Sequence, residues 1–217
     1  MISKRLIIAL DTDDLNLVKK ISAFFDPKLC LMKVGLQLYI AHGKEVLDYL
    51  SEQGFEIFLD LKLHDIPNTV AKAIKEIQKF NIKMTTIHSQ GGVEMINAAL
   101  DQSNDIKILA VSLLTSLDKQ DVSRLYDNDF EKQFEMLLKV IIDTKTHGIV
   151  CSSHELVKIS DNNLIKVVPG IRNVDVSDDQ KRIMSSKAAY ANGADFIVVG
   201  RPIINSENPS EEYKKYL

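Results

Sequence analysis

The chain of 217 residues contains no tryptophan and only two cysteines, Cys30 and Cys151. Two cysteines are too few for a disulfide framework, and both lie in or beside apolar runs without the spacing of metal ligands. The sequence therefore argues against a disulfide-stapled scaffold and predicts two core thiols in a reducing compartment.

The chain also lacks an excess of positive charge and any long apolar run. Its 27 Lys and Arg and 30 Asp and Glu residues give a formal charge of −3, and the basic residues are scattered. This pattern argues against nucleic acid as a partner but allows a small anionic ligand. No apolar run approaches membrane-spanning length and no signal-peptide pattern opens the chain, so we expect a cytoplasmic protein.

What the chain does contain is a regular alternation of apolar runs and helical patterns. Buried strands are predicted at residues 6–10, 29–34, 56–61, 84–87, 106–114, 148–151, 165–168 and 196–199. Helical patterns lie between most of them, for example at residues 15–25, 45–50, 69–80, 93–100 and 130–142. Such alternation is typical of a parallel sheet, and eight units in a chain of this size favour a closed (β/α)₈ TIM barrel over an open sheet. We expect one domain spanning residues 1–217.

The most informative segment is Asp60-Leu-Lys-Leu-His-Asp-Ile-Pro-Asn-Thr69, where an apolar strand gives way to charge. Residues two apart on a strand share a face, so Asp60 and Lys62 are predicted on one side, with Asp65 beyond the strand end. The Ile-Pro-Asn turn is expected to cap a helix starting near Thr69. A group of solvated surface ion pairs is the alternative for this motif taken alone.

Most of the predicted strands end in a residue able to bind or react. These residues are Asp11, Lys33, Asp60, Lys62, His88, Thr115, Ser116, Ser152, Arg172 and Arg201. In a barrel these ends meet at one mouth, where enzymes of this fold carry their active sites. The ring of polar residues therefore predicts a catalytic site.

The last two strands indicate what this mouth holds. Pro169-Gly-Ile-Arg172 and Val199-Gly-Arg-Pro202 follow strands seven and eight, where this fold often binds phosphate through backbone N–H groups and nearby cations. Gly200 permits a close backbone approach, and Arg201 offers a guanidinium suited to a dianion. Residues 173–180 form a long polar connection that serves either as a lid or as a mobile surface loop.

The chain resembles the orotidine 5'-phosphate decarboxylase family over nearly its whole length. The resemblance rests on the Asp60–Thr69 segment, on the two segments after strands seven and eight, and on Ala9-Leu-Asp11, Lys33-Val-Gly35, Leu114-Thr-Ser116 and Asp179-Gln-Lys-Arg-Ile-Met184. The resemblance implies a TIM barrel that uses no metal and no organic cofactor. It implies conversion of orotidine 5'-monophosphate to uridine 5'-monophosphate and CO₂ in pyrimidine synthesis. It also implies a homodimer in which Asp65 and Thr69 reach the partner subunit's site.

The same resemblance implies a role for each matching residue. Lys33, Asp60, Lys62 and Asp65 would form an alternating charge network. Lys62, its ammonium form favoured by two carboxylates, would stabilise the developing carbanion and donate a proton to C6, while Asp60 would face the substrate carboxylate.

Ligand contacts are implied as well. Asp11, Lys33 and Thr69 would contact the ribose, Thr115 or Ser116 the pyrimidine, and Arg172, Gln180, Gly200 and Arg201 the phosphate. The choice between Thr115 and Ser116 stays open. His88 is left outside the site, because a structural histidine is an equally good interpretation.

Two alternatives remain. Magnesium-dependent sugar-phosphate relatives, the 3-keto-L-gulonate 6-phosphate decarboxylases and hexulose phosphate synthases, share the Asp-x-Lys-x-x-Asp motif. They use a carboxylate near the position of Lys33, and a lysine there would repel a divalent cation. A barrel that only binds nucleotide is the non-enzyme alternative, and the intact charged motif argues against it.

Overall fold

The computed structural model describes residues 5–161, 163–173 and 184–217. Eight parallel strands close into a barrel in the order of the sequence, with β1 paired to both β2 and β8. The strands are β1 (Leu6–Ala9), β2 (Cys30–Gly35), β3 (Ile57–Leu63), β4 (Ile82–His88), β5 (Lys107–Val111), β6 (Gly148–Val150), β7 (Ile165–Pro169) and β8 (Phe196–Val199). The predicted (β/α)₈ barrel is confirmed.

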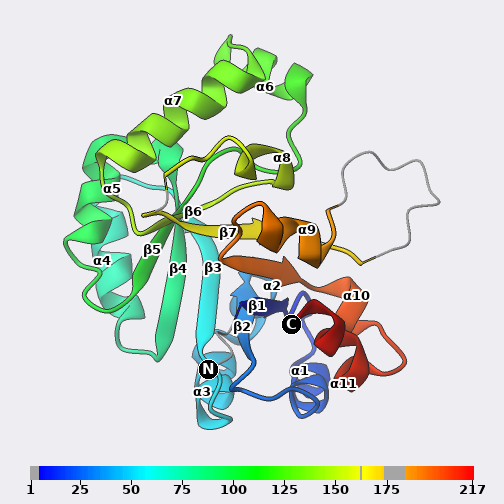
Figure 1. The fold of residues 1–217 in the computed structure, drawn as a ribbon. Helices are drawn as coiled ribbons and strands as arrows, with labels where there is room; N and C mark the ends of the chain where they lie inside the picture. The colour runs from blue at the N-terminus through cyan, green and yellow to red at the C-terminus, as the bar shows by residue number, and fades with distance from the viewer. Residues whose placement is uncertain (1–4, 162, 174–183) are drawn as a thin grey trace.

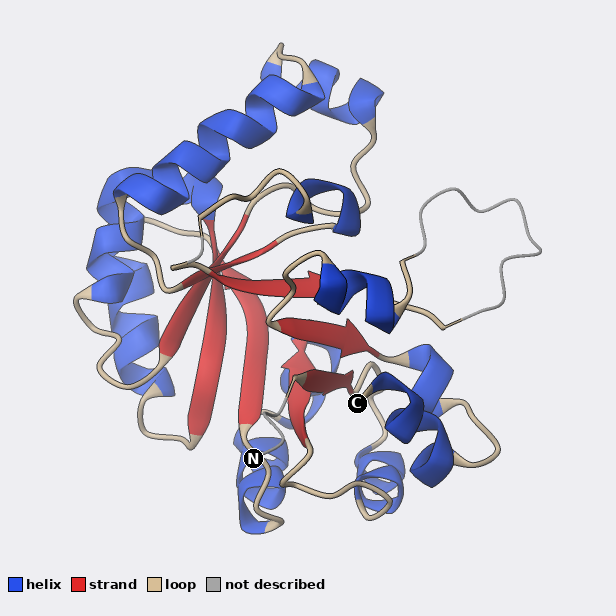
Figure 2. Cartoon of the chain, in the orientation of Figure 1, coloured by secondary structure: helices blue, strands red, loops and turns tan. Residues whose placement is uncertain are grey.

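Helices surround the strands on the outside of the barrel (Figures 1 and 2). They are α1 (Leu15–Ser22), α2 (Leu36–His42), α3 (Lys44–Glu52), α4 (Pro67–Ile77), α5 (Gly92–Leu100), α6 (Lys119–Tyr126), α7 (Phe130–Asp143), α8 (Ser153–Leu156), α9 (Ser186–Ala191), α10 (Arg201–Ile204) and α11 (Pro209–Glu212). Two 3₁₀ turns, η1 (Ser89–Gly91) and η2 (Tyr213–Tyr216), complete the elements. Among the described residues, no helix has both the length and the apolar character required to cross a membrane.

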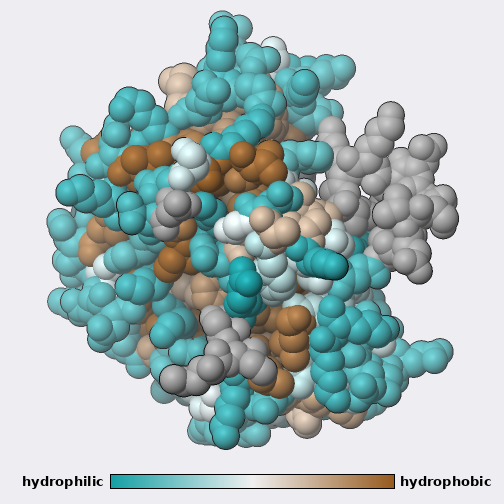
Figure 3. Space-filling model, viewed as in Figure 1, coloured by the Kyte–Doolittle hydropathy of each residue, from teal (hydrophilic) through white to brown (hydrophobic). Residues whose placement is uncertain are grey.

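Two buried clusters hold the barrel together. The inner cluster fills the barrel with residues from seven of the strands: Ile7, Ala9, Leu31, Phe58, Met84, Leu109, Val167 and Val198. The outer cluster lies between strands and helices, and it contains both free cysteines, Cys30 and Cys151. Because successive strand residues face opposite sides, these seven strands supply both clusters. The outside of the molecule is mostly hydrophilic on the face shown in Figure 3, with smaller hydrophobic areas.

Three local predictions need correction. Helix α4 begins at Pro67, two residues before the expected start at Thr69, and its N-cap Ile66 makes no side-chain hydrogen bond. Proline at the first helical turn needs no N–H partner and has a helical φ already, which explains the earlier start. Strand β5 ends at Val111, so the predicted apolar run to residue 114 is partly loop.

The alternating charges of Glu211-Glu-Tyr-Lys-Lys215 predict a solvated final helix, and this is wrong for the aromatic residues in and after it. Tyr213 and Tyr216 are 4% and 1% exposed and belong to the outer core, with Tyr213 edge-on to Phe25 at 5.2 Å between ring centroids. Only the charged side chains between and before them face solvent, in i,i+3 pairs such as Lys214 with Glu211. The segment therefore closes the core next to α1.

Candidate active site

A cavity of about 280 Å³ opens where the carboxyl ends of the strands meet. Its lining combines a charged side with an apolar side. It comprises Ala9, Asp11, Lys33, Phe58, Asp60, Lys62, Val111, Leu113, Leu114, Thr115, Val150, Pro169, Gly170, Ile171, Arg172, Val198, Gly200, Arg201 and Pro202. A concave site with a few convergent polar groups in an apolar wall is the usual form of a small-molecule site.

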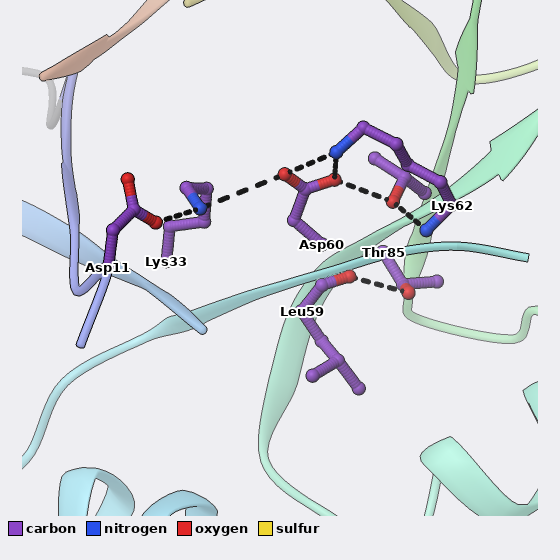
Figure 4. Close-up of polar contacts among 7 residues, drawn as sticks. Asp11, Lys33, Leu59, Asp60, Lys62 and Thr85 are labelled. Atoms are coloured by element: carbon purple, nitrogen blue, oxygen red, sulfur yellow. Dashed lines mark hydrogen bonds and ion pairs between the residues drawn. The ribbon is translucent and has the colours of Figure 1, made fainter. Parts of the chain in front are cut away.

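A row of alternating charges crosses one wall of the cavity (Figure 4): Asp11, Lys33, Asp60 and Lys62. The Lys33 Nζ lies 2.9 Å from an Asp11 oxygen and 3.8 Å from an Asp60 oxygen. The Lys62 Nζ donates to both Asp60 oxygens at 2.9 Å each. Each inner charge thus has an opposite charge beside it, which lowers the cost of burying it.

Strand pairing brings the row together. In the β2–β3 ladder Lys33 lies opposite Phe58 and Gly35 opposite Asp60, so Lys33 and Asp60 come from adjacent strands. Strand β3 extends to Leu63, beyond the predicted end at residue 61, so Lys62 lies within it as Asp60 does, and the two side chains meet on the cavity side. The exposed fraction of the side chain is 11% for Lys33 and 13% for Asp60, against 33% for Lys62 and 55% for Asp11.

The backbone at Lys62 departs from ordinary strand geometry. Its φ is +51°, in the left-handed region that residues with a side chain adopt rarely. The register between β3 and β4 shifts between Leu59 and Leu63, around this residue. Unusual backbone of this kind persists only where neighbouring contacts hold it, and it gathers at functional sites.

Asp65 and Thr69, the two residues expected to serve a partner subunit, lie outside this cavity. Both are exposed, and neither belongs to its lining. One Asp65 oxygen accepts the N–H of Ile66 at 2.7 Å, and no ion pair joins Asp65 to another described residue of its own chain. The other three members of the predicted network, Lys33, Asp60 and Lys62, are brought together.

The expected phosphate end is formed by the loops after β7 and β8. Gly170, Arg172, Gly200 and Arg201 all line the cavity. A Cβ atom at Gly200 would lie 3.3 Å from the Cβ of Ala9 and 3.4 Å from an Asp11 oxygen, so a larger residue would crowd this wall. Gln180, also expected at the phosphate, lies outside the described residues, as do residues 174–179 of the expected lid.

Among the two candidates for a pyrimidine contact, Thr115 lines the cavity and Ser116 does not. Ser152, placed by sequence in the ring of strand ends, instead caps α8: its side-chain oxygen accepts the N–H of Glu155, whose carboxylate accepts the N–H of Ser152. Burial raises the pKa of the Glu155 carboxyl, and neither residue lines this cavity. Ser152 is therefore a capping residue.

His88 ends β4 beside the charge row, and it is 7% exposed. Its ring stacks on that of His64 at 5.4 Å between centroids, and its Nδ1 has no hydrogen-bond partner among the described residues. Burial, helped by the charges of His64 and Lys62, lowers the pKa of His88 to about 4. The ring is therefore neutral near pH 7.

Sequence reasoning did not single out two residues that shape the row. Gly35 leaves room for the Lys33 ammonium, because a Cβ at that position would lie 3.0 Å from the Lys33 Nζ. Thr86, from β4, contacts both Asp60 and the backbone of Lys62. The motif Lys33-Val-Gly35 held a signal for the glycine, whereas Thr86 lies inside an apolar strand and carries no such signal of its own.

No group of three or more His, Cys, Asp or Glu side chains suited to a metal ion occurs within residues 5–161, 163–173 and 184–217. The position between Asp11 and Asp60 is occupied by the Lys33 ammonium. Magnesium prefers oxygen ligands in an octahedral arrangement, so a cationic side chain here competes directly with it.

Comparison with known proteins identifies relatives over nearly the whole chain. Residues 4–216 match the model of the orotidine 5'-phosphate decarboxylase / HUMPS family. The chain is 42% identical over 210 residues to the orotidine 5'-phosphate decarboxylase of Ehrlichia canis, covering 94% of this chain and 92% of that protein. It is 39% identical to the enzyme of the same name from Malacoplasma penetrans, covering 98% of this chain and 96% of that one.

Two solved structures share the fold. Orotidine 5'-phosphate decarboxylase from Lactobacillus acidophilus superposes with a TM-score of 0.85 at 35% identity, covering 99% of both chains. An uncharacterized conserved protein from Geobacillus kaustophilus gives a TM-score of 0.83 at 26% identity, covering 98% of this chain and 100% of that one.

Proposed function

We propose a mechanism for this chain, which belongs to the orotidine 5'-phosphate decarboxylase / HUMPS family. Its reaction is that of a carboxy-lyase, the conversion of orotidine 5'-monophosphate to uridine 5'-monophosphate and CO₂. This reaction supplies UMP in pyrimidine biosynthesis. The observation that carries the mechanism is the row of alternating charges, with Lys62 at one end.

Lys62 is the proposed proton donor. Loss of CO₂ breaks the bond between C6 and the carboxyl carbon and leaves the electron pair on C6. The Lys62 ammonium faces this position from the cavity wall, stabilises the developing negative charge and then donates a proton to C6. The resulting amine regains a proton from solvent. Its bonds to both Asp60 oxygens hold the ammonium ready before substrate arrives.

Asp60 is proposed to face the substrate carboxylate. Its side chain is 13% exposed and is held from two sides by lysines, so it has little freedom to turn away from an incoming anion. Like charges forced together raise the energy of the bound substrate, and departure of neutral CO₂ relieves it. The apolar side of the cavity, with Phe58, Val111 and Val198, limits access of water to the carbanion.

The remaining binding roles keep their sequence-based assignments as proposals. Asp11 and Lys33 contact the ribose, and Thr115 is favoured over Ser116 for the pyrimidine because it lines the cavity. Arg172, Gly200 and Arg201 surround the phosphate. The role of Gln180 and of a closing lid stays a prediction, as do the single domain and the cytoplasmic location.

A homodimer is proposed to complete each site. Asp65 and Thr69 are exposed beside Ile66, which is 66% exposed, and Asp65 has no ion-pair partner among the described residues of its own chain. Leu36 and Ile40, after β2, and Val93, after β4, are also 48–79% exposed. Large exposed apolar side chains that follow three neighbouring strands are typical of a protein interface. In this arrangement Asp65 extends the partner's charge row.

The proposal is tested by mixing the purified protein with orotidine 5'-monophosphate in the presence of a chelator and following loss of the orotate ultraviolet band. Lys62→Ala is run in parallel. Its matched control is Lys139→Ala, which removes a lysine from an exposed pair with Asp143 at 2.8 Å. We expect turnover by the wild type and Lys139→Ala, and loss of turnover by at least roughly 1,000-fold in Lys62→Ala.

A folded wild-type protein that leaves orotidine 5'-monophosphate unchanged would overturn the proposed function. If magnesium together with a sugar-phosphate acid such as 3-keto-L-gulonate 6-phosphate then gave turnover, the chain would act as one of the magnesium-dependent sugar-phosphate relatives. Tight binding of UMP without turnover of any of these substrates would indicate a nucleotide-binding barrel.

A further inference from the structure

Thr86 lies directly behind the charge row, on the neighbouring strand β4. It is fully buried, and it is absent from the lining of the cavity. Its Oγ1 accepts the backbone N–H of Lys62 at 2.9 Å and donates to one Asp60 oxygen, also at 2.9 Å. One hydroxyl group therefore joins the backbone of the proposed proton donor to the carboxylate that orients it.

The backbone contact is the more informative of the two. Lys62 has φ +51°, and the β3–β4 register is interrupted around it, so its N–H cannot enter the regular ladder with β4. A buried N–H without a partner is costly, and the Thr86 hydroxyl supplies the missing acceptor from the strand that the ladder would have used. The hydroxyl thereby stabilises a conformation that lysine otherwise avoids.

The contact with Asp60 has a different consequence. That oxygen also accepts from the Lys62 Nζ, so the hydroxyl proton and the ammonium share one carboxylate. Because the hydroxyl must point its proton at Asp60, its lone pairs face the Lys62 N–H. The orientation of each bond fixes that of the other.

We propose that Thr86 is a positioning residue for decarboxylation and acts as a hydroxyl clamp. Its hydroxyl holds Lys62 in its left-handed backbone conformation and orients the Asp60 carboxylate toward the Lys62 ammonium. This inference rests on the proposed function of the site. It predicts that loss of the hydroxyl lowers kcat while leaving nucleotide affinity almost unchanged, because Thr86 does not line the cavity.

The neighbouring residue offers a matched control. Thr85 is also fully buried, and its hydroxyl donates to the carbonyl oxygen of Leu59 at 2.8 Å (Figure 4). This hydrogen bond connects β4 to β3, as those of Thr86 do, but the Thr85 side chain faces the outer core. Thr86→Val and Thr85→Val therefore remove the same group from the same strand, and only one of them touches the charge row.

The experiment compares wild type, Thr86→Val, Thr86→Ser and Thr85→Val. We expect Thr86→Val to lose roughly 10- to 100-fold in kcat, with UMP affinity within about threefold of wild type. Thr86→Ser, which keeps the hydroxyl, should restore kcat to within about threefold, and Thr85→Val should keep it. Hydrogen exchange at the Lys62 amide should be at least about tenfold faster in Thr86→Val than in wild type and Thr85→Val.

Equal kcat in Thr86→Val and Thr85→Val, or unchanged exchange at the Lys62 amide, would overturn the clamp. If Thr86→Val does not fold, Thr86→Ala against Thr86→Ser isolates the hydroxyl with the same expectations. The proposed function fails separately, when the wild type itself gives no turnover. Exchange at Lys62 then still decides whether Thr86 holds its backbone.

Discussion

Asp60→Asn is the sharpest single change to the charge row, because it alters charge with almost no change in shape. In the wild type the Asp60 carboxylate accepts two hydrogen bonds from Lys62 at 2.9 Å and lies 3.8 Å from the Lys33 ammonium. The asparagine keeps one oxygen and turns the other position into a donor that faces a cation. Lys62 loses one charge-assisted bond, and Lys33 loses its inner counter-charge.

The size of the effect follows from these contacts. A hydrogen bond to a charged group contributes roughly 1.5–3 kcal/mol, and weakening of the remaining bond to the neutral amide adds about 1 kcal/mol. We therefore expect the transition-state stabilisation provided by the Lys62 ammonium to fall by roughly 3 kcal/mol, because the ammonium is held less firmly. This corresponds to about a 100-fold lower kcat/KM.

The assay is the initial rate of loss of the orotate band, with melting temperature measured on the same samples. Asp143→Asn is the matched control, since it removes a carboxylate paired with Lys139 at 2.8 Å on the exposed surface, where such pairs contribute about 0–1 kcal/mol. It should leave kcat/KM within about twofold. An Asp60→Asn enzyme within about fivefold of wild type would refute the reasoning that Asp60 orients Lys62.

Three further predictions concern the surroundings of the row. Gly35→Ala should push the Lys33 ammonium aside, lowering kcat/KM by roughly tenfold in the rate assay with little change in melting temperature, because only a flexible side-chain end is displaced. The low pKa of His88, about 4, means that the unfolded state binds the proton first. Stability measured by urea unfolding should therefore fall by up to about 3 kcal/mol as pH drops from about 6.5 towards 4, and His88→Gln should flatten this slope. Mixed Asp65→Asn and Lys62→Ala subunits should recover about a quarter of wild-type activity in the rate assay, since half of the randomly paired dimers carry one intact site. No recovery after subunit exchange would contradict a shared site.

The fold could be predicted from the sequence because each strand and its helix carry local signals. Eight apolar runs of strand length matched the eight strands, and their strict alternation with helical patterns left a closed barrel as the simplest parallel arrangement. Short helices were missed: α8 and α10 have four residues each, too few to show a helical period. The buried tyrosines of η2 were missed because a segment rich in charge looks solvated even when its aromatic side chains point inward.

The charged part of the site could likewise be predicted, since residues that end parallel strands meet at one face whatever the details of packing. The sequence by itself determined that Lys33, Asp60 and Lys62 would be neighbours. Only the tertiary structure decided how they are held. The left-handed backbone of Lys62, the room left by Gly35 and the hydroxyl of Thr86 depend on the register between β2, β3 and β4, which is an interaction between distant segments and has no signal within any one of them.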